Sequence, residues 1–214
     1  EQLSFGFVDE IAQLYYNDYE ANATTLTKTF DLRYRDEDVR PQIDAIWSKA
    51  YNTIASANSV LDNISGHDFA ILPRIRGEAL TVRAFLHFDL LRLFAPNIER
   101  GDEQAIPYVE HFSISPVERS TVREVYERIV ADLTEAYGLL RDAQPASGRT
   151  PEELYVSQYA AAALLARVCN WGGDHETAER YALEALKGPF AFIREEQIKN
   201  LFLGYTARTE CIWG

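Results

Sequence analysis

Apolar residues recur at steps of three or four along much of the chain, and this spacing predicts helices. The first stripe contains Val39, Ile43, Ile46, Ala50, Ile54, Ala57, Leu61 and Ile64. Such steps keep side chains on one face of an α-helix. Asp38 precedes the stripe as an expected N-cap, Pro41 fits only a first turn, and Gly66 follows the last apolar position. The sequence therefore predicts an amphipathic helix from about 39 to 65.

The same spacing predicts four further helices, near residues 74–94, 121–142, 152–170 and 174–187. Thr121 and Glu124 have the spacing of a capping box, and Asp174 is placed to cap the last helix. Thr150, followed by a proline at the next position, is expected to cap the fourth helix. The connection between the first two helices is short, which favours an antiparallel pair.

Small residues and a tight turn mark the last two predicted helices as a hairpin. Alanines stand at Ala161, Ala166, Ala178 and Ala185, and Gly172-Gly173-Asp174 separates the two stripes. Small side chains let paired helices approach closely, as in a tetratricopeptide repeat. We therefore expect an all-α fold of tetratricopeptide-like helical hairpins. Long irregular loops are expected at 15–36 and 96–120, and such loops often bind ligands.

Charge and composition exclude several classes of protein. The chain has 21 Lys and Arg against 33 Asp and Glu, for a net charge of −12, which disfavours nucleic acid as a partner. An apolar fraction of 47% is too high for a disordered chain. No apolar run approaches the roughly 20 residues that a membrane-spanning helix needs.

The sequence contains no pattern that indicates catalysis, a metal or a cofactor. The four histidines are scattered, and the two cysteines, Cys169 and Cys211, have no zinc-site spacing. A nucleophile elbow and a phosphate-binding glycine loop are absent. We therefore expect no catalytic residues, no metal site and no cofactor, with the histidines on the surface or in helix packing.

Charged residues within the predicted helix 74–94 are expected to be structural. Glu78, Arg83 and Asp89 lie among apolar residues, where a charge needs a partner, so we predict ion pairs within the helical bundle. Asn58 stands beside the first stripe and is predicted to be a buried hydrogen-bonding residue.

The same helix carries the segments by which the chain resembles a known family: Gly77-Glu78-Ala79, Arg83-Ala84-Phe85 and His87-Phe88-Asp89-Leu90. Further matching segments follow in order along the chain: Trp47-x3-Tyr51-x2-Ile54-x3-Asn58-x2-Leu61, Ile106-Pro107, Arg119-x-Thr121-Val122-x2-Val125-Tyr126, Asp132-Leu133, Ala163-Leu164-Leu165-Ala166-Arg167-Val168, Gly173-Asp174 and Glu210-Cys211-Ile212. Together they resemble the SusD/RagB family of outer-membrane glycan-binding lipoproteins over about 38–214.

The resemblance implies a function and a localisation. Family members are lipoproteins of Bacteroidetes that bind oligosaccharides or polysaccharides outside the cell and associate with a TonB-dependent, SusC-like transporter; they are not enzymes. The resemblance implies the outer membrane, facing outside, with a lipid anchor that this chain lacks. Members are more than twice as long, so the chain is expected to be an N-terminal portion of one SusD-like domain over 1–214. Its expected parts are an irregular part at 1–37, helical hairpins at 38–187, and the start of a C-terminal part at 188–214.

Candidate ligand contacts are sought in the loops, because stripe residues are occupied by helix packing. Sugars present apolar C–H faces and a ring of hydroxyls, which suit an exposed aromatic face beside planar polar groups. Tyr34, Arg35 and Asp36 supply these types in one loop and form the predicted ligand-binding site. Tyr108 and Phe112 lie in the other loop, where packing is the alternative role. The alternative function is a helical-repeat scaffold that binds a protein or peptide.

Overall fold

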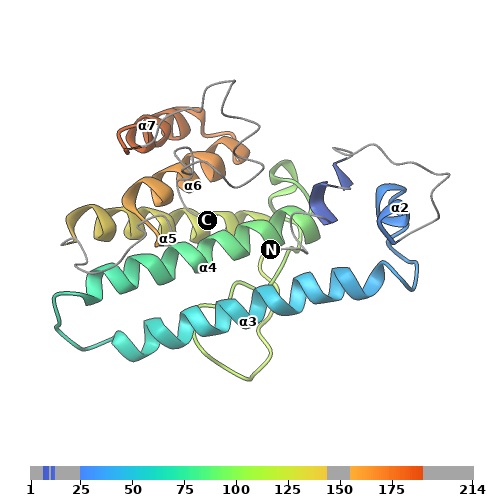
Figure 1. Ribbon diagram of the computed structural model, residues 1–214, viewed down its shortest axis with the longest axis horizontal. Helices are drawn as coiled ribbons and strands as arrows, with labels where there is room; N and C mark the ends of the chain where they lie inside the picture. The colour runs from blue at the N-terminus through green and yellow to red at the C-terminus, as the bar shows by residue number, and fades with distance from the viewer. Residues whose placement is uncertain (1–6, 10, 13–24, 144–154, 190–214) are drawn as a thin grey trace, which may run out of the picture. The chain divides into compact units, whose positions relative to one another are not determined.

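The described part of the chain is helical. The computed structural model describes residues 7–9, 11–12, 25–143 and 155–189. Its elements are α2 (Thr25–Phe30), α3 (Arg40–Ile64), α4 (Leu72–Phe94), the 3-10 turn η2 (Ile98–Arg100), α5 (Val122–Asp142), α6 (Gln158–Trp171) and α7 (His175–Ala185), shown in Figure 1. Within these ranges the only β pairing is an isolated bridge between Gln104 and Thr121. The all-α prediction is confirmed.

The chain divides into two units, Glu1–Thr53 and Ile54–Gly214, with the border inside α3. In the first unit, the short helix α2 lies in a segment for which the sequence predicts irregular structure. Six residues are too few to display a helical apolar stripe, and three of the six are threonine, which has a low helix propensity.

In the second unit, α4 and α5 pack antiparallel. Gly77 near the start of α4 lies against Leu140 near the end of α5, whereas Arg83, farther along α4, meets Asp132, which comes earlier in α5. A Cβ atom at Gly77 would lie 2.7 Å from the Leu140 side chain, so glycine permits this close approach. Leu61 of α3 adds to the same core.

The next helices continue the antiparallel order. Leu140 near the end of α5 clusters with Ala160 and Ala161 at the start of α6, and Tyr126 near the start of α5 meets Trp171 at the end of α6. Helix α7 then packs back on α6 after a turn in which Gly173 has a φ of +83°. Alanines on the facing surfaces allow this close packing, which confirms the predicted hairpin.

Helix ends follow the predicted caps in two cases and depart from them in two others. The capping box of Thr121 and the cap by Asp174 are present. Helix α6, however, begins after Ser157, whose hydroxyl accepts a hydrogen bond from the Ala160 N–H at 3.1 Å. The predicted start at 152 is therefore wrong, and Thr150 lies outside the described residues. Asp38 is not the cap of α3, because the helix begins at Arg40 and Val39 stands at the position before it. The Asp38 carboxylate pairs instead with Lys28 of α2.

The segment between α4 and α5 is irregular, as the sequence predicts, apart from the 3-10 turn η2. None of the helices in the described ranges is both long enough and apolar enough to cross a lipid bilayer.

Removing the cap of α5 tests how much this end stabilises the second unit. The Glu124 N–H donates to the Thr121 hydroxyl at 3.3 Å, and the Thr121 N–H donates to the Glu124 carboxylate at 2.8 Å. Thr121→Ala should lower the free energy of unfolding by about 1 kcal/mol. Thr134→Ala, on the exposed face of the same helix, should be neutral or slightly stabilising because alanine has the higher helix propensity. Urea unfolding measures both, and equal effects would contradict the capping role.

Candidate functional site

The turn between α2 and α3 carries the residues predicted to bind a ligand. Leu32 has a φ of 57°, in the left-handed region that residues other than glycine rarely adopt. The Leu32 N–H donates to the Thr29 carbonyl at 3.0 Å, and the Arg33 N–H donates to the Lys28 carbonyl at 2.9 Å. This pair of bonds is the Schellman motif, which ends α2 and turns the chain sharply.

A lysine of α2 holds the far side of the turn. Lys28 Nζ lies 3.2 Å from Asp36 Oδ1 and also pairs with Asp38. Arg33 Nη2 lies 3.0 Å from the other Asp36 oxygen. The Asp38 N–H and Lys28 both donate to Asp36 and lower its pKa, while the two carboxylates raise the pKa of Lys28. Both Asp36 oxygens are therefore occupied within the protein.

The three predicted ligand residues have different environments. Tyr34 is 63% exposed, and Arg35 is exposed with no carboxylate of the described segments at ion-pair distance. Asp36 is half-buried and anchors the turn. The structure thus leaves Tyr34 and Arg35 open to solvent and uses Asp36 to fix the backbone beside them.

In the second unit, a buried ion pair joins α4 to α5. Arg83 Nε lies 2.7 Å from Asp132 Oδ2, and Arg83 Nη2 lies 2.8 Å from Asp132 Oδ1. This two-point geometry is the strongest arrangement of an arginine with a carboxylate. The prediction that Arg83 forms an ion pair within the helical bundle is confirmed, and its partner lies on α5. Asp89 pairs instead with Arg92 on its own helix.

The free edge of the Arg83 guanidinium reaches the irregular segment before α5. Arg83 Nη1 donates to the Glu110 carbonyl at 3.0 Å and to Asn58 Oδ1 at 3.1 Å. Asn58 in turn donates from Nδ2 to the Val109 carbonyl at 2.8 Å. Asn58 is fully buried, which confirms its predicted role as an internal hydrogen-bonding residue.

Two rings complete what we term the buried polar cluster: Asn58, Arg83, His87, Tyr108 and Asp132. The Tyr108 hydroxyl donates to Asp132 Oδ2 at 2.6 Å, and its ring stacks on His87 with centroids 4.0 Å apart. His87 Nδ1–H donates to the Arg83 carbonyl at 2.9 Å, and Nε2 accepts from the Val109 N–H at 3.1 Å. Tyr108 is therefore a packing residue, which was its alternative role.

Burial sets the charge of this cluster. It lowers the pKa of His87 to about 3, which keeps the ring neutral and leaves Nε2 free to accept a hydrogen bond. Burial and the nearby Asp132 raise the pKa of Tyr108, so its hydroxyl stays a donor. Burial opposes the charge of Arg83, but the bonds to Asp132 outweigh it and raise the pKa.

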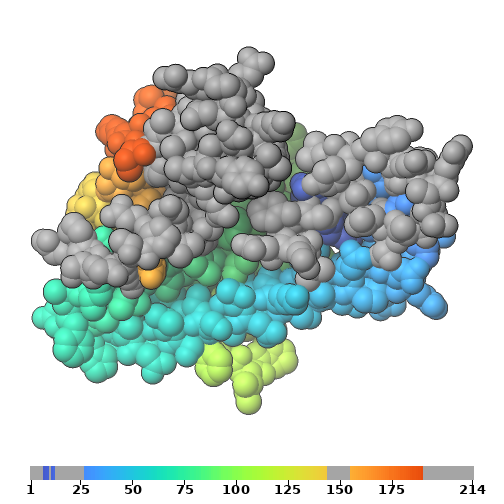
Figure 2. Space-filling model, in the orientation of Figure 1, coloured from blue at the N-terminus to red at the C-terminus, as the bar shows by residue number. Residues whose placement is uncertain are grey.

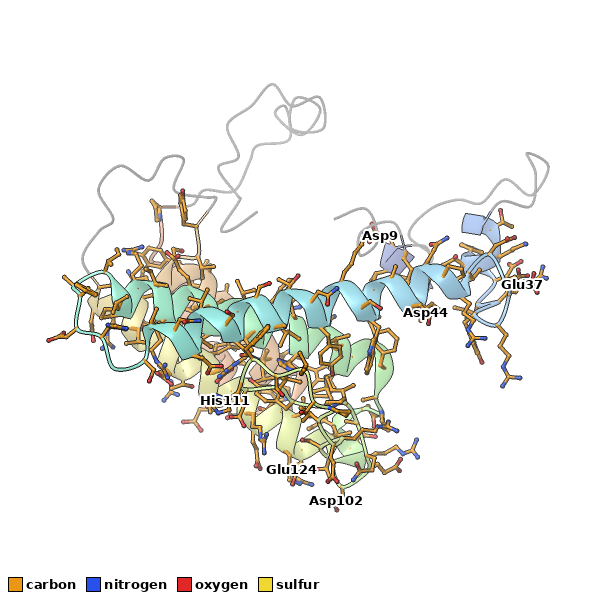
Figure 3. The ribbon with its side chains drawn as sticks, turned by 90° about the horizontal axis from the view of Figure 1, so that it is seen from below. Asp9, Glu37, Asp44, Asp102, His111 and Glu124 are labelled. Atoms are coloured by element: carbon orange, nitrogen blue, oxygen red, sulfur yellow. The ribbon has the colours of Figure 1, made fainter. Side chains whose placement is uncertain are left out.

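Beyond this cluster, every residue from 110 to 119 is exposed. The base of the exposed stretch is tied to α3: His111 Nδ1 lies 2.9 Å from Asp62 Oδ1, and the Phe112 N–H donates to Asp62 Oδ2 at 2.8 Å. These contacts lower the pKa of Asp62. Figure 3 labels His111 on this segment. The sequence carried no signal for Asp62, a single acid on a polar helix face.

Other candidate sites in the described segments offer few groups that could bind a metal or a sugar. No group of three or more potential metal ligands occurs in the described segments. An open cavity of about 270 Å³ is lined by Ala70, Pro73, Gly138, Leu139, Asp142 and Ala143. Its one charged group, Asp142, is bonded to Arg141. A sugar site needs several polar groups to orient the hydroxyls, and this cavity does not provide them.

Comparison with known proteins places this helical arrangement in one class, the SusD-like proteins. The family model described as "Starch-binding associating with outer membrane" matches residues 8–169. The chain therefore belongs to the SusD-like family, as its sequence motifs indicate, and the family is associated with the outer membrane.

Individual relatives agree with this assignment. SusD-like protein P2 of Formosa agariphila is 31% identical over 170 residues, which cover 75% of this chain and 30% of that protein. A SusD-like carbohydrate binding protein from Bacteroides vulgatus is 26% identical, with a TM-score of 0.69, over 81% of this chain and 37% of that chain. A SusD superfamily protein from the same species has a TM-score of 0.75 at 22% identity. The match covers 90% of this chain and 45% of that chain, and it shows similarity of the fold alone. The chain thus spans less than half the length of these relatives.

Removing Arg83 should destabilise the second unit strongly. Arg83→Ala leaves the buried Asp132 carboxylate without its cation, which should cost about 3–5 kcal/mol of unfolding free energy. Arg76→Ala is the matched control, because Arg76 and Glu135 join the same two helices at 2.6 Å but are both exposed. An exposed pair is worth about 0–1 kcal/mol. Urea unfolding compares the two variants, and similar losses would show that burial of the Arg83 pair is irrelevant.

The buried histidine predicts a pH dependence of stability. The unfolded chain takes up a proton at His87 below its ordinary pKa of 6.5, whereas the folded chain does so only near 3. Stability is therefore complete above pH 6.5 and falls as the pH falls toward 3, by about 2 kcal/mol from this residue at pH 5. Wild type should have a higher free energy of unfolding than His87→Gln at pH 7. This excess should be smaller at pH 5 by that amount, as measured by urea unfolding.

The exposed His175→Gln serves as the control for this measurement. It should keep the pH dependence of the wild type. If His87→Gln keeps it as well, the histidine does not contribute to the pH dependence.

Proposed function

We propose that the protein to which this chain belongs is a non-enzymatic glycan-binding protein of the cell surface. In this proposal it captures oligosaccharides and delivers them to a TonB-dependent outer-membrane transporter. A lipid anchor holds it on the outer face of the membrane. Family membership supports this proposal, as does the carbohydrate-binding relative from Bacteroides vulgatus.

The observation within the chain that carries the proposal is the anchored turn with Tyr34 exposed beside Arg35. A tyrosine ring offers an apolar face to the C–H groups of a sugar, and a guanidinium donates hydrogen bonds to hydroxyls. The Lys28 and Asp36 contacts fix the backbone before a ligand arrives, so little ordering is needed on binding. Asp36 contributes to the proposed site by holding this geometry.

The open character of this turn sets the expected strength of binding. A stacking contact on an exposed ring contributes about 1 kcal/mol, and the sugar hydroxyls must exchange well-formed bonds to water. Micromolar to millimolar dissociation constants are therefore expected for the full-length protein.

Calorimetric titration of the full-length protein with maltooligosaccharides and laminarin oligosaccharides tests the site. Tyr34→Ala should weaken binding of any oligosaccharide that the wild type binds by about fivefold, which corresponds to ~1 kcal/mol. Phe69→Ala is the matched control, because Phe69 is also a loop aromatic and is also 63% exposed. It should bind as the wild type does.

Two outcomes would count against the proposal at different levels. Equal affinities of Tyr34→Ala and wild type would remove this turn from the site and leave glycan binding intact. A wild type that binds no member of a broad glycan array would instead favour the helical scaffold for a protein or peptide.

A further inference from the structure

The segment between α4 and α5 contains a loop, residues 107–119, that is joined to the helices by side chains. Its neck is closed where the Ala105 N–H donates to the Ser120 carbonyl at 2.8 Å and the Ser120 N–H donates to the Ile106 carbonyl at 3.1 Å. Beyond this neck, no hydrogen bond between backbone groups of described residues involves 107–119. Figure 2 shows part of the loop, in yellow-green, protruding from the surface. The position of the loop therefore depends on a few side chains of α3, α4 and α5.

His87 of α4 provides one of these contacts, and its bond to the loop requires a neutral ring. The fully buried ring stacks on Tyr108, and its Nδ1–H donates to the Arg83 carbonyl at 2.9 Å. Because a carbonyl only accepts, Nε2 is the nitrogen without a proton, and it accepts from the Val109 N–H at 3.1 Å. A proton on Nε2 would set two N–H groups against each other. Protonation therefore removes the bond between the ring and the loop.

The groups around the ring on α4 and α5 keep it neutral while the loop covers it. Burial and the positive charge of Arg83 lower the pKa of His87 to about 3. A carboxylate favours a proton on a nearby histidine, but the Asp132 oxygens already accept hydrogen bonds from Arg83 and Tyr108. Burial raises the pKa of Tyr108, so this ring carries no charge. The covered histidine thus takes up a proton far less readily than one in water.

The other charged groups that hold the loop keep their contacts in mild acid. Glu110 Oε2 lies 3.2 Å from Arg128 Nη1, so this carboxylate is paired. Bonds from His111 and from the Phe112 N–H lower the pKa of Asp62, which therefore stays ionised. A proton on His111 strengthens its pairing with Asp62, at 2.9 Å, because it adds a positive charge. The bond of His87 is accordingly the first of these contacts to be lost as the pH falls.

We propose that the loop is a pH-sensitive element, in which protonation of His87 releases residues 107–119 from α4 while the helices stay packed. The loop yields first because, within the described residues, side chains alone join it to the helices. Helix α4 keeps its backbone hydrogen bonds and the two-point contact of Arg83 with Asp132. The surface that the exposed stretch presents thus differs between neutral and acid pH. This inference does not depend on the proposed glycan binding.

The direction of the effect follows from the two states of the histidine. In the closed loop His87 is neutral, whereas in the released loop it meets water and regains its ordinary pKa of 6.5. Release therefore takes up a proton, and the released fraction grows as the pH falls below 6.5. Buried histidines act as acid switches in other proteins by the same uptake of a proton.

Hydrogen–deuterium exchange of the full-length protein, followed by mass spectrometry, tests this release. Labelling times at each pH are scaled to the exchange rate of unstructured peptides. Between pH 7 and pH 5 the opening constant of the peptide 107–112 should rise about 25-fold, the ratio for a histidine whose pKa moves from about 3 to 6.5 on opening. Peptides of α4 and α5 should stay unlabelled at times when the loop peptide is labelled.

Two variants identify the group that responds to acid. His87→Gln retains a side chain that can accept from the Val109 N–H but does not titrate, so the opening constant of the loop should no longer depend on pH. His111→Gln is the matched control, because His111 is the histidine of the loop itself and is exposed. It should keep the rise that the wild type shows.

The remaining outcomes overturn the proposal. A loop peptide that becomes labelled only together with α4 and α5 reports global unfolding, and an opening constant that does not change with pH shows that no acid-driven release occurs. A response that persists in His87→Gln, or that disappears in His111→Gln, belongs to another group. If His87→Gln does not fold, the comparison of loop and helix peptides in the wild type still separates local release from global unfolding, and His111→Gln still tests the other histidine.

Discussion

The bidentate pair of Arg83 and Asp132 is the contact on which the second unit depends most. It joins α4 to α5 at a buried point. Arg83 Nη1, the guanidinium nitrogen that does not contact Asp132, donates to the backbone of the segment between these helices. A charge buried at this depth is tolerated only when it is well hydrogen-bonded, and here Asn58 and the Glu110 carbonyl accept from Arg83 Nη1 in addition to the bonds to Asp132. One interaction therefore sets both the helix pair and the course of the loop.

The helices could be predicted because their signals are local. Apolar stripes, the Thr121 capping box and the Gly172-Gly173 turn each act within a few residues, so their effect is visible in the chain itself. The start of α6 was misplaced because Thr150-Pro151 and Ser157 both offer caps, and sequence alone does not decide between two competing local signals. Helix α2 was missed because its six residues are too short for a periodic pattern.

The sites were less predictable because they depend on contacts between distant residues. Arg83 was expected to have a partner, but Asp132 stands 49 positions away, and spacing carries no information at that distance. Tyr108 and Phe112 are both aromatic residues of one loop, yet one is buried under α4 and the other is exposed. What separates them is the bonding of Tyr108 to Asp132, which only the folded chain reveals.

Acidic residues have a common role in the two exposed features, although these lie in different units. Asp36 fixes the turn beside Tyr34, and Asp62 fixes the loop below Phe112; each accepts a backbone N–H within the protein. Part of the hydrogen-bonding capacity of each carboxylate is thus used within the protein, so a high count of acids does not imply acidic ligand contacts. The aromatic residues beside these carboxylates are instead the groups left open to solvent. In both features the carboxylate orders the backbone and the neighbouring aromatic side chain is exposed to solvent.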